Sequence, residues 1–220
     1  MDKTDVQLKQ QIEDELRWDP RINSAQIGVS VNNGAVSLMG AVDTYPEKYA
    51  AEEATKRVSG VRSVAQELTV KILSDHVRSD ADIASAVQTA LTWDLLIPKA
   101  VTASVRDGWV TLHGVATWNH QREAAERAVR YLTGVAGVSN SVTLKPQTNP
   151  AQVKESIQSA LERQALSDTT AIHVDTLGGR VTLTGQVSSW KSIDDAAKAA
   201  WAAPGVTEVV DRLRMPEPTT

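Results

Sequence analysis

Three glycines recur with the same spacing in three successive stretches of the 220-residue chain. In each stretch the second glycine follows the first by six residues, and the third follows the second by twenty. A long sequence period of this kind indicates one structural unit that is repeated along the chain. We therefore predict three modules, at residues 4–72, 79–145 and 149–216. The structural turn glycines that anchor them are Gly34, Gly40 and Gly60; Gly108, Gly114 and Gly134; and Gly179, Gly185 and Gly205.

Each module opens with residues typical of a capped amphipathic helix. Apolar residues four positions apart form one stripe on a helix, which faces a core. A polar residue, Thr4, Ser79 or Asn149, stands four positions before each stripe, and a Gln or Asp follows it three positions later, as in a capping box. The stripes are Leu8, Ile12 and Leu16; Ile83, Val87 and Leu91; and Val153, Ile157 and Leu161.

A β-hairpin is predicted next, because apolar residues alternate with polar ones on both sides of a two-residue turn. The turns are Asn33-Gly34, Asp107-Gly108 and Gly178-Gly179, dipeptides that accept the positive φ angles of a type I′ turn. A second helix with alanines at matched positions and a last strand complete each unit. The predicted fold class is α+β: three tandem αββαβ modules, each a three-stranded mixed sheet with two helices packed on one face.

These motifs resemble the BON domain, a family named from bacterial osmotically inducible and nodulation proteins. The resemblance is carried best by residues 33–40, NGAVSLMG, residues 57–61, RVSGV, and residues 107–114, DGWVTLHG. It covers nearly the whole chain and implies the αββαβ fold. It also implies a bacterial, transport-associated protein that binds phospholipid or other envelope components in stress protection. No ligand residue follows from the resemblance, because the shared glycines and valines are structural.

Charge and composition exclude several function classes. The formal net charge is −4, and none of the three segments divided at residues 74 and 147 carries a net positive charge, so we expect no nucleic-acid partner. Without cysteine the chain has no disulfide, thiolate metal site or lipobox. No signal peptide and no apolar run of membrane-spanning length are visible. A cytoplasmic protein is expected, or a periplasmic one if the N-terminus is processed.

No catalytic constellation is visible, so we predict a non-enzymatic protein with no cofactor and no metal site. The four histidines, His76, His113, His120 and His173, include no pair at the i, i+4 spacing that places two metal ligands on one helix face. Adjacent carboxylates such as those of residues 13–15 point about 100° apart on a helix and do not converge on a substrate.

Six tryptophans stand out in a chain that has no phenylalanine. Trp93 and Trp118, with Arg122, Arg127 and Arg130, form the candidate surface for lipid or a protein partner, because amphipathic rings and long cationic side chains favour such interfaces. In the alternative interpretation the tryptophans pack between modules, since buried aromatic area dominates interface energetics. The preferred function is binding of phospholipid or cell-envelope components. The alternatives are a cytoplasmic protein-interaction scaffold and an ion or small-ligand sensor.

Overall fold

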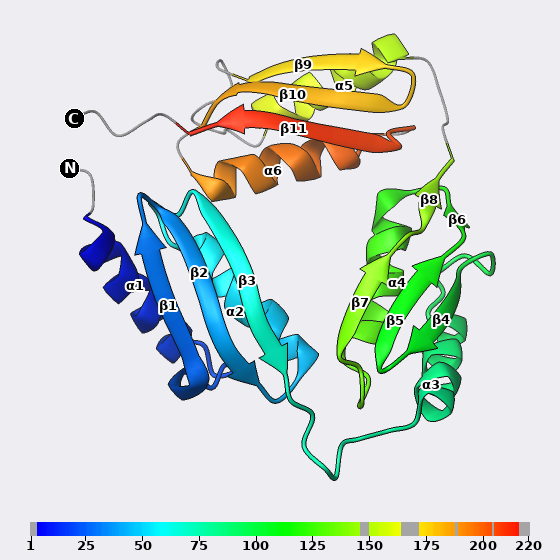
Figure 1. Cartoon of the computed structure of the whole chain (residues 1–220). Helices are drawn as coiled ribbons and strands as arrows, with labels where there is room; N and C mark the ends of the chain where they lie inside the picture. The colour runs from blue at the N-terminus through cyan, green and yellow to red at the C-terminus, as the bar shows by residue number, and fades with distance from the viewer. Residues whose placement is uncertain (1–3, 146–149, 164–171, 188, 204, 216–220) are drawn as a thin grey trace.

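The computed structural model describes residues 4–145, 150–163, 172–187, 189–203 and 205–215. Over these residues the chain forms three αββαβ modules, and the predicted fold class is confirmed (Figure 1). The N-cap predicted at Asn149 lies outside the described residues.

The elements of the three modules follow one another in the same order. Module 1 contains α1 (Asp5–Trp18), a short 3-10 helix (Ser24–Gln26), β1 (Ile27–Asn32), β2 (Ala35–Val42), α2 (Tyr45–Arg57) and β3 (Ser63–Val70). Module 2 contains α3 (Asp80–Trp93), β4 (Thr102–Arg106), β5 (Trp109–His113), β6 (Val115–Ala116), α4 (Asn119–Arg130), β7 (Gly137–Asn140) and β8 (Thr143–Leu144). Module 3 contains α5 (Pro150–Arg163), β9 (Ile172–Leu177), β10 (Arg180–Gln186), α6 (Trp190–Trp201) and β11 (Glu208–Arg214).

The second strand of each hairpin is the centre of its sheet. In module 1, β1 pairs antiparallel with β2, and β3 returns parallel to β2 on the other side. Module 2 has the same order, β4-β5-β7, and is prolonged by the short parallel pair β6 and β8. Each central strand directs a fully buried leucine at the core of its own module: Leu38, Leu112 and Leu183. Each module therefore folds around a separate core.

The middle anchor glycine is needed for two reasons: its φ angle is positive, and there is no room for a Cβ atom at its position. Gly114 has φ of +119°, and a Cβ built there would lie 2.1 Å from the carbonyl oxygen of Ala100. Gly40 repeats this arrangement in module 1, where the Cβ would lie 2.1 Å from the carbonyl oxygen of Gln26. Any side chain at these two positions would force neighbouring backbone segments apart, which explains why the repeat places a glycine there.

An aspartate at the first position of the first helix holds the hairpin turn in modules 1 and 2. The carboxylate of Asp5 accepts hydrogen bonds from the backbone N–H groups of Asn33 (2.7 Å) and Gly34 (3.2 Å). Asp80 accepts the corresponding two bonds from the turn of module 2, both at 2.9 Å. Each aspartate thereby ties a helix to a hairpin distant in sequence.

The turn of module 3 departs from the predicted type. Gly178 has φ of +62°, whereas Gly179 lies outside the positive-φ region, as in a type II′ turn rather than type I′. In the other two modules both turn residues have positive φ. Pro150 occupies the position of the aspartates in module 3, so that position offers no carboxylate to turn amides.

Capping of the first helices follows the sequence pattern in module 1 and varies it in module 2. Thr4 and Gln7 form both bonds of a capping box, at 3.3 and 3.2 Å. In module 2 the hydroxyl of Ser79 accepts from the backbone N–H of Asp82, but it also donates to the Asp82 carboxylate at 2.6 Å. The side chain of Asp82 is shorter than that of Gln7, and it bonds to the hydroxyl of the cap residue, whereas Gln7 bonds to the backbone N–H of its cap residue.

The modules meet through their second helices. Tyr45 of α2 and Trp201 of α6 pack partly buried against the core of module 2, and Trp190 of α6 packs against the core of module 1. Figure 1 shows α6 on the side of module 3 that faces the other two modules. Aromatic residues at both ends of α6 thus connect module 3 to both of its neighbours.

Candidate functional site

An exposed apolar turn follows α3 in module 2. Its side chains Trp93, Leu95 and Leu96 are 81%, 99% and 50% exposed, and we call these three residues the module 2 tip. The turn is closed by Asp94, whose carboxylate accepts from the N–H of Leu96 (2.9 Å) and whose carbonyl accepts from the N–H of Ile97 (3.1 Å). This closure places Ile97 in the core and leaves both leucines outside.

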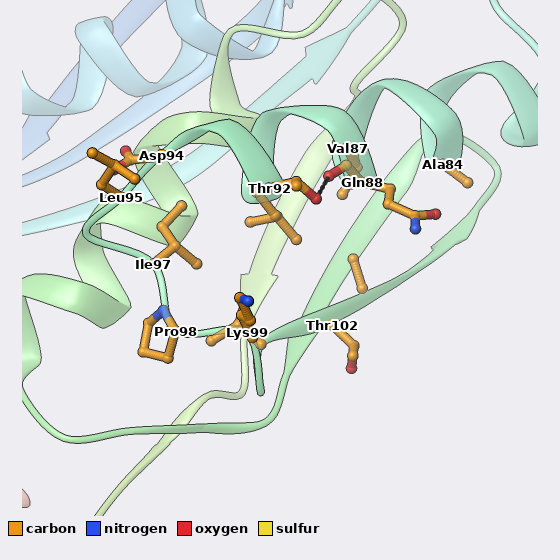
Figure 2. Close-up of a pocket in the computed structure, with 13 residues that line it drawn as sticks. Ala84, Val87, Gln88, Thr92, Asp94, Leu95, Ile97, Pro98, Lys99 and Thr102 are labelled. Atoms are coloured by element: carbon orange, nitrogen blue, oxygen red, sulfur yellow. Dashed lines mark hydrogen bonds between the residues drawn. The ribbon is translucent and has the colours of Figure 1, made fainter.

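A pocket of about 830 Å³ lies beside the tip, between α3 and the segment that leads into β4. Figure 2 shows α3 along one side and the loop that carries Ile97, Pro98 and Lys99 along the other. Its apolar lining comes from core residues that include Val87 and Leu91, and Leu95 stands at its edge. Lys99 also lines the pocket, is exposed, and pairs with no carboxylate of the described chain. The site combines an apolar lining with one unpaired cation.

The predicted surface residues differ in their exposure and in their contacts. Trp93 belongs to the exposed tip, whereas Trp118 precedes α4, is half-buried and stacks on His120 with ring centroids 6.3 Å apart. Arg127 is exposed on α4. Trp93 and Arg127 are thus exposed, whereas Trp118 is half-buried.

Arg122 and Arg130 stand at junctions between modules. The guanidinium carbon of Arg130 lies 3.4 Å from the centroid of the Tyr49 ring of module 1, and Arg130 also pairs with Glu126 at 2.7 Å. Burial opposes the charged form of Arg130, but its hydrogen bond with Glu126 and its contacts with Tyr49 leave its pKa raised. Arg122 lies 4.7 Å from the Trp201 ring of module 3, and burial lowers its pKa. Helix α4 therefore contacts both neighbouring modules through cation–π pairs.

The corresponding turn of module 1 is polar. Trp18, at the position of Trp93, is 85% exposed, but Pro20 and Arg21 stand where module 2 has its two leucines. Asp19 is buried and accepts from Arg21 at the backbone N–H, Nε and Nη2, at 3.1, 2.9 and 2.6 Å.

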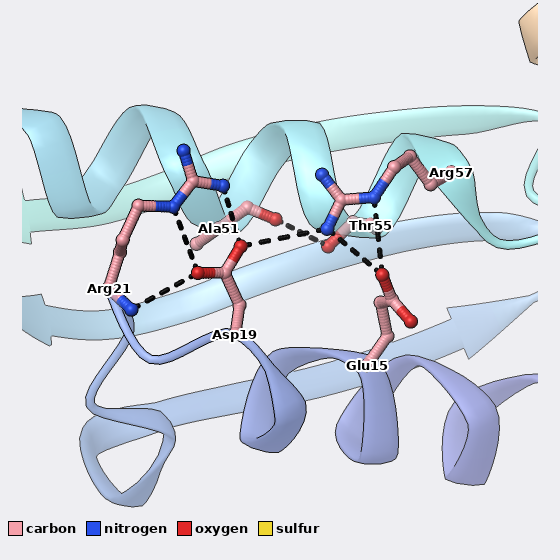
Figure 3. A network of polar contacts seen from close by, with 6 residues as sticks. All are labelled: Glu15, Asp19, Arg21, Ala51, Thr55 and Arg57. Atoms are coloured by element: carbon pink, nitrogen blue, oxygen red, sulfur yellow. Dashed lines mark hydrogen bonds and ion pairs between the residues drawn. The ribbon is translucent and has the colours of Figure 1, made fainter.

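Asp19 is the centre of an ion-pair network in this turn. Arg57 lies 3.6 Å from its carboxylate and bonds to Glu15 at 2.9 Å (Figure 3). The hydrogen bond from the Arg21 side chain, against the opposing effect of burial, holds the pKa of Asp19 far below its usual range. The two exposed tryptophans therefore have different surroundings, ionic in module 1 and apolar in module 2.

Within the described residues no group of three or more His, Asp or Glu side chains is placed to hold a metal ion. His113 lies with its Nε2 3.2 Å from the hydroxyl of Ser104 on the exposed side of β4 and β5. In the same part of the chain no helix is long and apolar enough to cross a membrane.

Trp93 is among the surface residues predicted from the sequence, whereas Leu95, Leu96 and Lys99 are not. The apolar stripe did not reveal them, because Leu95 lies four residues after Leu91 and so continues the same spacing. It is outside the core because α3 ends at Trp93. Comparison with Pro20 and Arg21 of the first module would have marked the difference.

Comparisons with known proteins place these observations in a family. Two solved structures of CdsD, described as a structural protein of the type III secretion system of Chlamydia trachomatis, align at 16% identity with TM-scores of 0.26. The first alignment covers 94% of this chain and 92% of that one, and the second, to the C-terminal domain, covers 98% and 100%. Likeness at this level adds no argument about function.

A relative in Escherichia coli strain K12, osmotically-inducible protein Y, is 28% identical over 129 residues. The alignment covers 56% of this chain and 64% of the relative, which is less than two thirds of its length. The BON domain pattern matches three times, at residues 4–72, 79–146 and 149–217. The chain therefore belongs to the BON domain family, of which it carries three tandem copies.

Proposed function

We propose that the protein binds phospholipid surfaces through the module 2 tip. The observation that carries this proposal is the exposure of Trp93, Leu95 and Leu96 on one turn, beside an apolar pocket and an unpaired lysine. A folded protein gains nothing internally from an exposed leucine, whereas the acyl boundary of a membrane accepts leucine and tryptophan together. Lys99 supplies a cation at the depth of the lipid phosphates.

The pocket gives the tip a second way to engage a lipid. Its lining of core side chains offers an apolar surface to the first carbons of an acyl chain, while Gln88 and Thr92 on α3 lie at the same pocket. Docking there places a headgroup phosphate toward Lys99. The contact then involves insertion of the tip and capture of part of one lipid molecule.

Electrostatic attraction contributes little to this binding. The chain carries a net charge of −4, so a local cation acts against an unfavourable overall field. A single lysine near an anionic surface contributes about 1 kcal/mol at physiological salt. Binding therefore depends mainly on the apolar side chains and depends only weakly on salt concentration.

The name of the E. coli relative suggests a biological setting for such binding. We place this binding in osmotic stress, because the name osmotically-inducible protein Y refers to osmotic induction. The cytoplasmic location expected from the sequence stays a prediction, as do the absence of enzymatic activity and of a nucleic-acid partner. Fractionation of expressing cells into cytoplasm, periplasm and membranes tests the location.

Vesicle flotation tests the proposed function. Vesicles with and without anionic phosphatidylglycerol are mixed with the wild-type protein and with Trp93→Ser. We expect the wild type to float with the vesicles and Trp93→Ser to lose most of that binding. Trp18→Ser is the matched control, because Trp18 ends the equivalent helix and is equally exposed. Failure of the wild type to float, or equal losses in both variants, contradicts the proposal.

A further inference from the structure

A cleft of about 510 Å³ opens between modules 1 and 3, away from the module 2 tip. Module 1 contributes Arg62, which precedes β3, and module 3 contributes the end of β10, the start of α6 and the end of β11. The backbone N–H of Arg62 donates to the carbonyl of Gly34 at 2.8 Å, and this bond holds the backbone from which the Arg62 side chain extends. The cleft is therefore lined by residues of both modules, with Arg62 as the contribution of module 1.

Two arginines from different modules give the cleft an excess of positive charge. Arg62 and Arg214 both line it, both are exposed, and within the described residues neither forms an ion pair. The one carboxylate in the lining belongs to Asp211, and it accepts from the backbone N–H of Leu213 at 2.8 Å. An anion that enters the cleft would thus meet two guanidinium groups free to form charge-assisted hydrogen bonds.

The rest of the cleft lining is apolar apart from Gln186. Trp190, Ile193 and Leu213 line it together with Met215. Trp190 is also the first residue of α6, so the positive end of this helix dipole lies at the cleft and favours a negative charge. The lining is therefore amphipathic, with cations and a large aromatic surface in one concavity.

We propose that this cleft binds an organic phosphate that carries an apolar substituent. The planar guanidinium groups of Arg62 and Arg214 match the oxygens of a phosphoryl group, and the apolar substituent packs on Trp190 and Leu213. Because the two arginines come from different modules, the bound phosphate bridges modules 1 and 3 and stabilises their contact. The site does not depend on the module 2 tip, so either proposal can fail alone.

Isothermal titration of the full chain tests this site with two soluble probes. These are inorganic phosphate and dihexanoyl phosphatidylglycerol, the latter kept below its micelle concentration. We expect the lipid monomer to bind more tightly than phosphate, and its affinity to fall at least tenfold in Arg62→Gln and in Arg214→Gln. Arg212→Gln is the control, because Arg212 is an exposed arginine of the same strand that does not line the cleft.

Vesicle binding by the same variants identifies the source of the phosphate. Weaker flotation of Arg62→Gln than of the wild type assigns the site to lipid headgroups in a bilayer. Unchanged flotation with weakened titration assigns it to a free phosphate ester. Absence of lipid binding, phosphate binding as tight as lipid binding, or an equal loss in Arg212→Gln overturns the proposal. Leu95→Ala, which removes part of the tip, should leave the titration unchanged.

Discussion

Truncation of Leu95 tests the tip with the least disturbance of the fold. This side chain is 99% exposed, so Leu95→Ala should change the free energy of unfolding by no more than about 0.5 kcal/mol. Each methylene transferred from water to an apolar phase contributes about 0.8 kcal/mol, so full insertion of the removed carbons contributes about 2 kcal/mol and half-depth insertion about 1 kcal/mol. We therefore expect vesicle affinity to fall by a factor of about 5 to 30.

The assay is a sedimentation isotherm, in which the bound fraction is measured against lipid concentration for sucrose-loaded vesicles. Leu177→Ala is the matched control, because Leu177 is an 82% exposed leucine at the end of β9 in module 3. Its truncation should leave the isotherm unchanged. The reasoning is refuted if Leu95→Ala binds as the wild type does, or if both leucine variants lose the same affinity.

Three further predictions concern the fold that holds the site. Gly114→Ala should lower the free energy of unfolding of module 2 in urea by about 3 to 5 kcal/mol, because the backbone strain at positive φ adds to the overlap of the new Cβ with the carbonyl of Ala100. Gly178→Ala, which has open space around its Cβ position, should lower it by only about 1 kcal/mol. Equal losses in the two variants would contradict the close approach of Gly114 to Ala100. Because the pKa of Asp19 is far lower in the folded than in the unfolded state, its contribution to stability is complete above about pH 4 and shrinks as pH falls below that value. Asp19→Asn should therefore lower the urea midpoint most at pH 7 and by a smaller amount at pH 3, where the folded carboxylate is still ionised; a pH-independent difference would argue against this. Arg130→Gln should loosen the junction at Tyr49 and increase the radius of gyration in X-ray scattering, while Arg127→Gln, on the same helix but exposed, should not.

The repeat made the fold predictable from the sequence. Local signals, namely the glycine spacing, the turn dipeptides and the stripes such as Leu8, Ile12 and Leu16, each specify an element without knowledge of the others. The clamps from Asp5 and Asp80 to the hairpin turns were not predicted, because they join residues that only the tertiary fold brings together. The turn at Gly178 differs for a related reason: a Gly-Gly dipeptide permits several turn types, and its sequence alone does not choose among them.

The candidate site was predictable only in part. A tryptophan at the end of a helix gives no sign of whether it faces solvent or a neighbouring module. Trp93 is exposed, whereas Trp190 and Trp201 pack at junctions, and that difference arises from how whole modules dock. Arg122 and Arg130 lie four and twelve residues beyond Trp118 in sequence, but they stack on rings from two other modules. Contacts between modules leave no periodic pattern in either partner.

The indole N–H signals of the six tryptophans offer the most direct measurement of how this protein meets a membrane. In an NMR spectrum of the chain with nanodiscs that contain a headgroup spin label, each indole reports its own distance from the lipid. We predict that the Trp93 signal broadens first and most, and that the signals of Trp18 and the junction residue Trp190 persist. Broadening of Trp18 equal to that of Trp93, or no selective broadening at saturating lipid, would contradict binding through the module 2 tip.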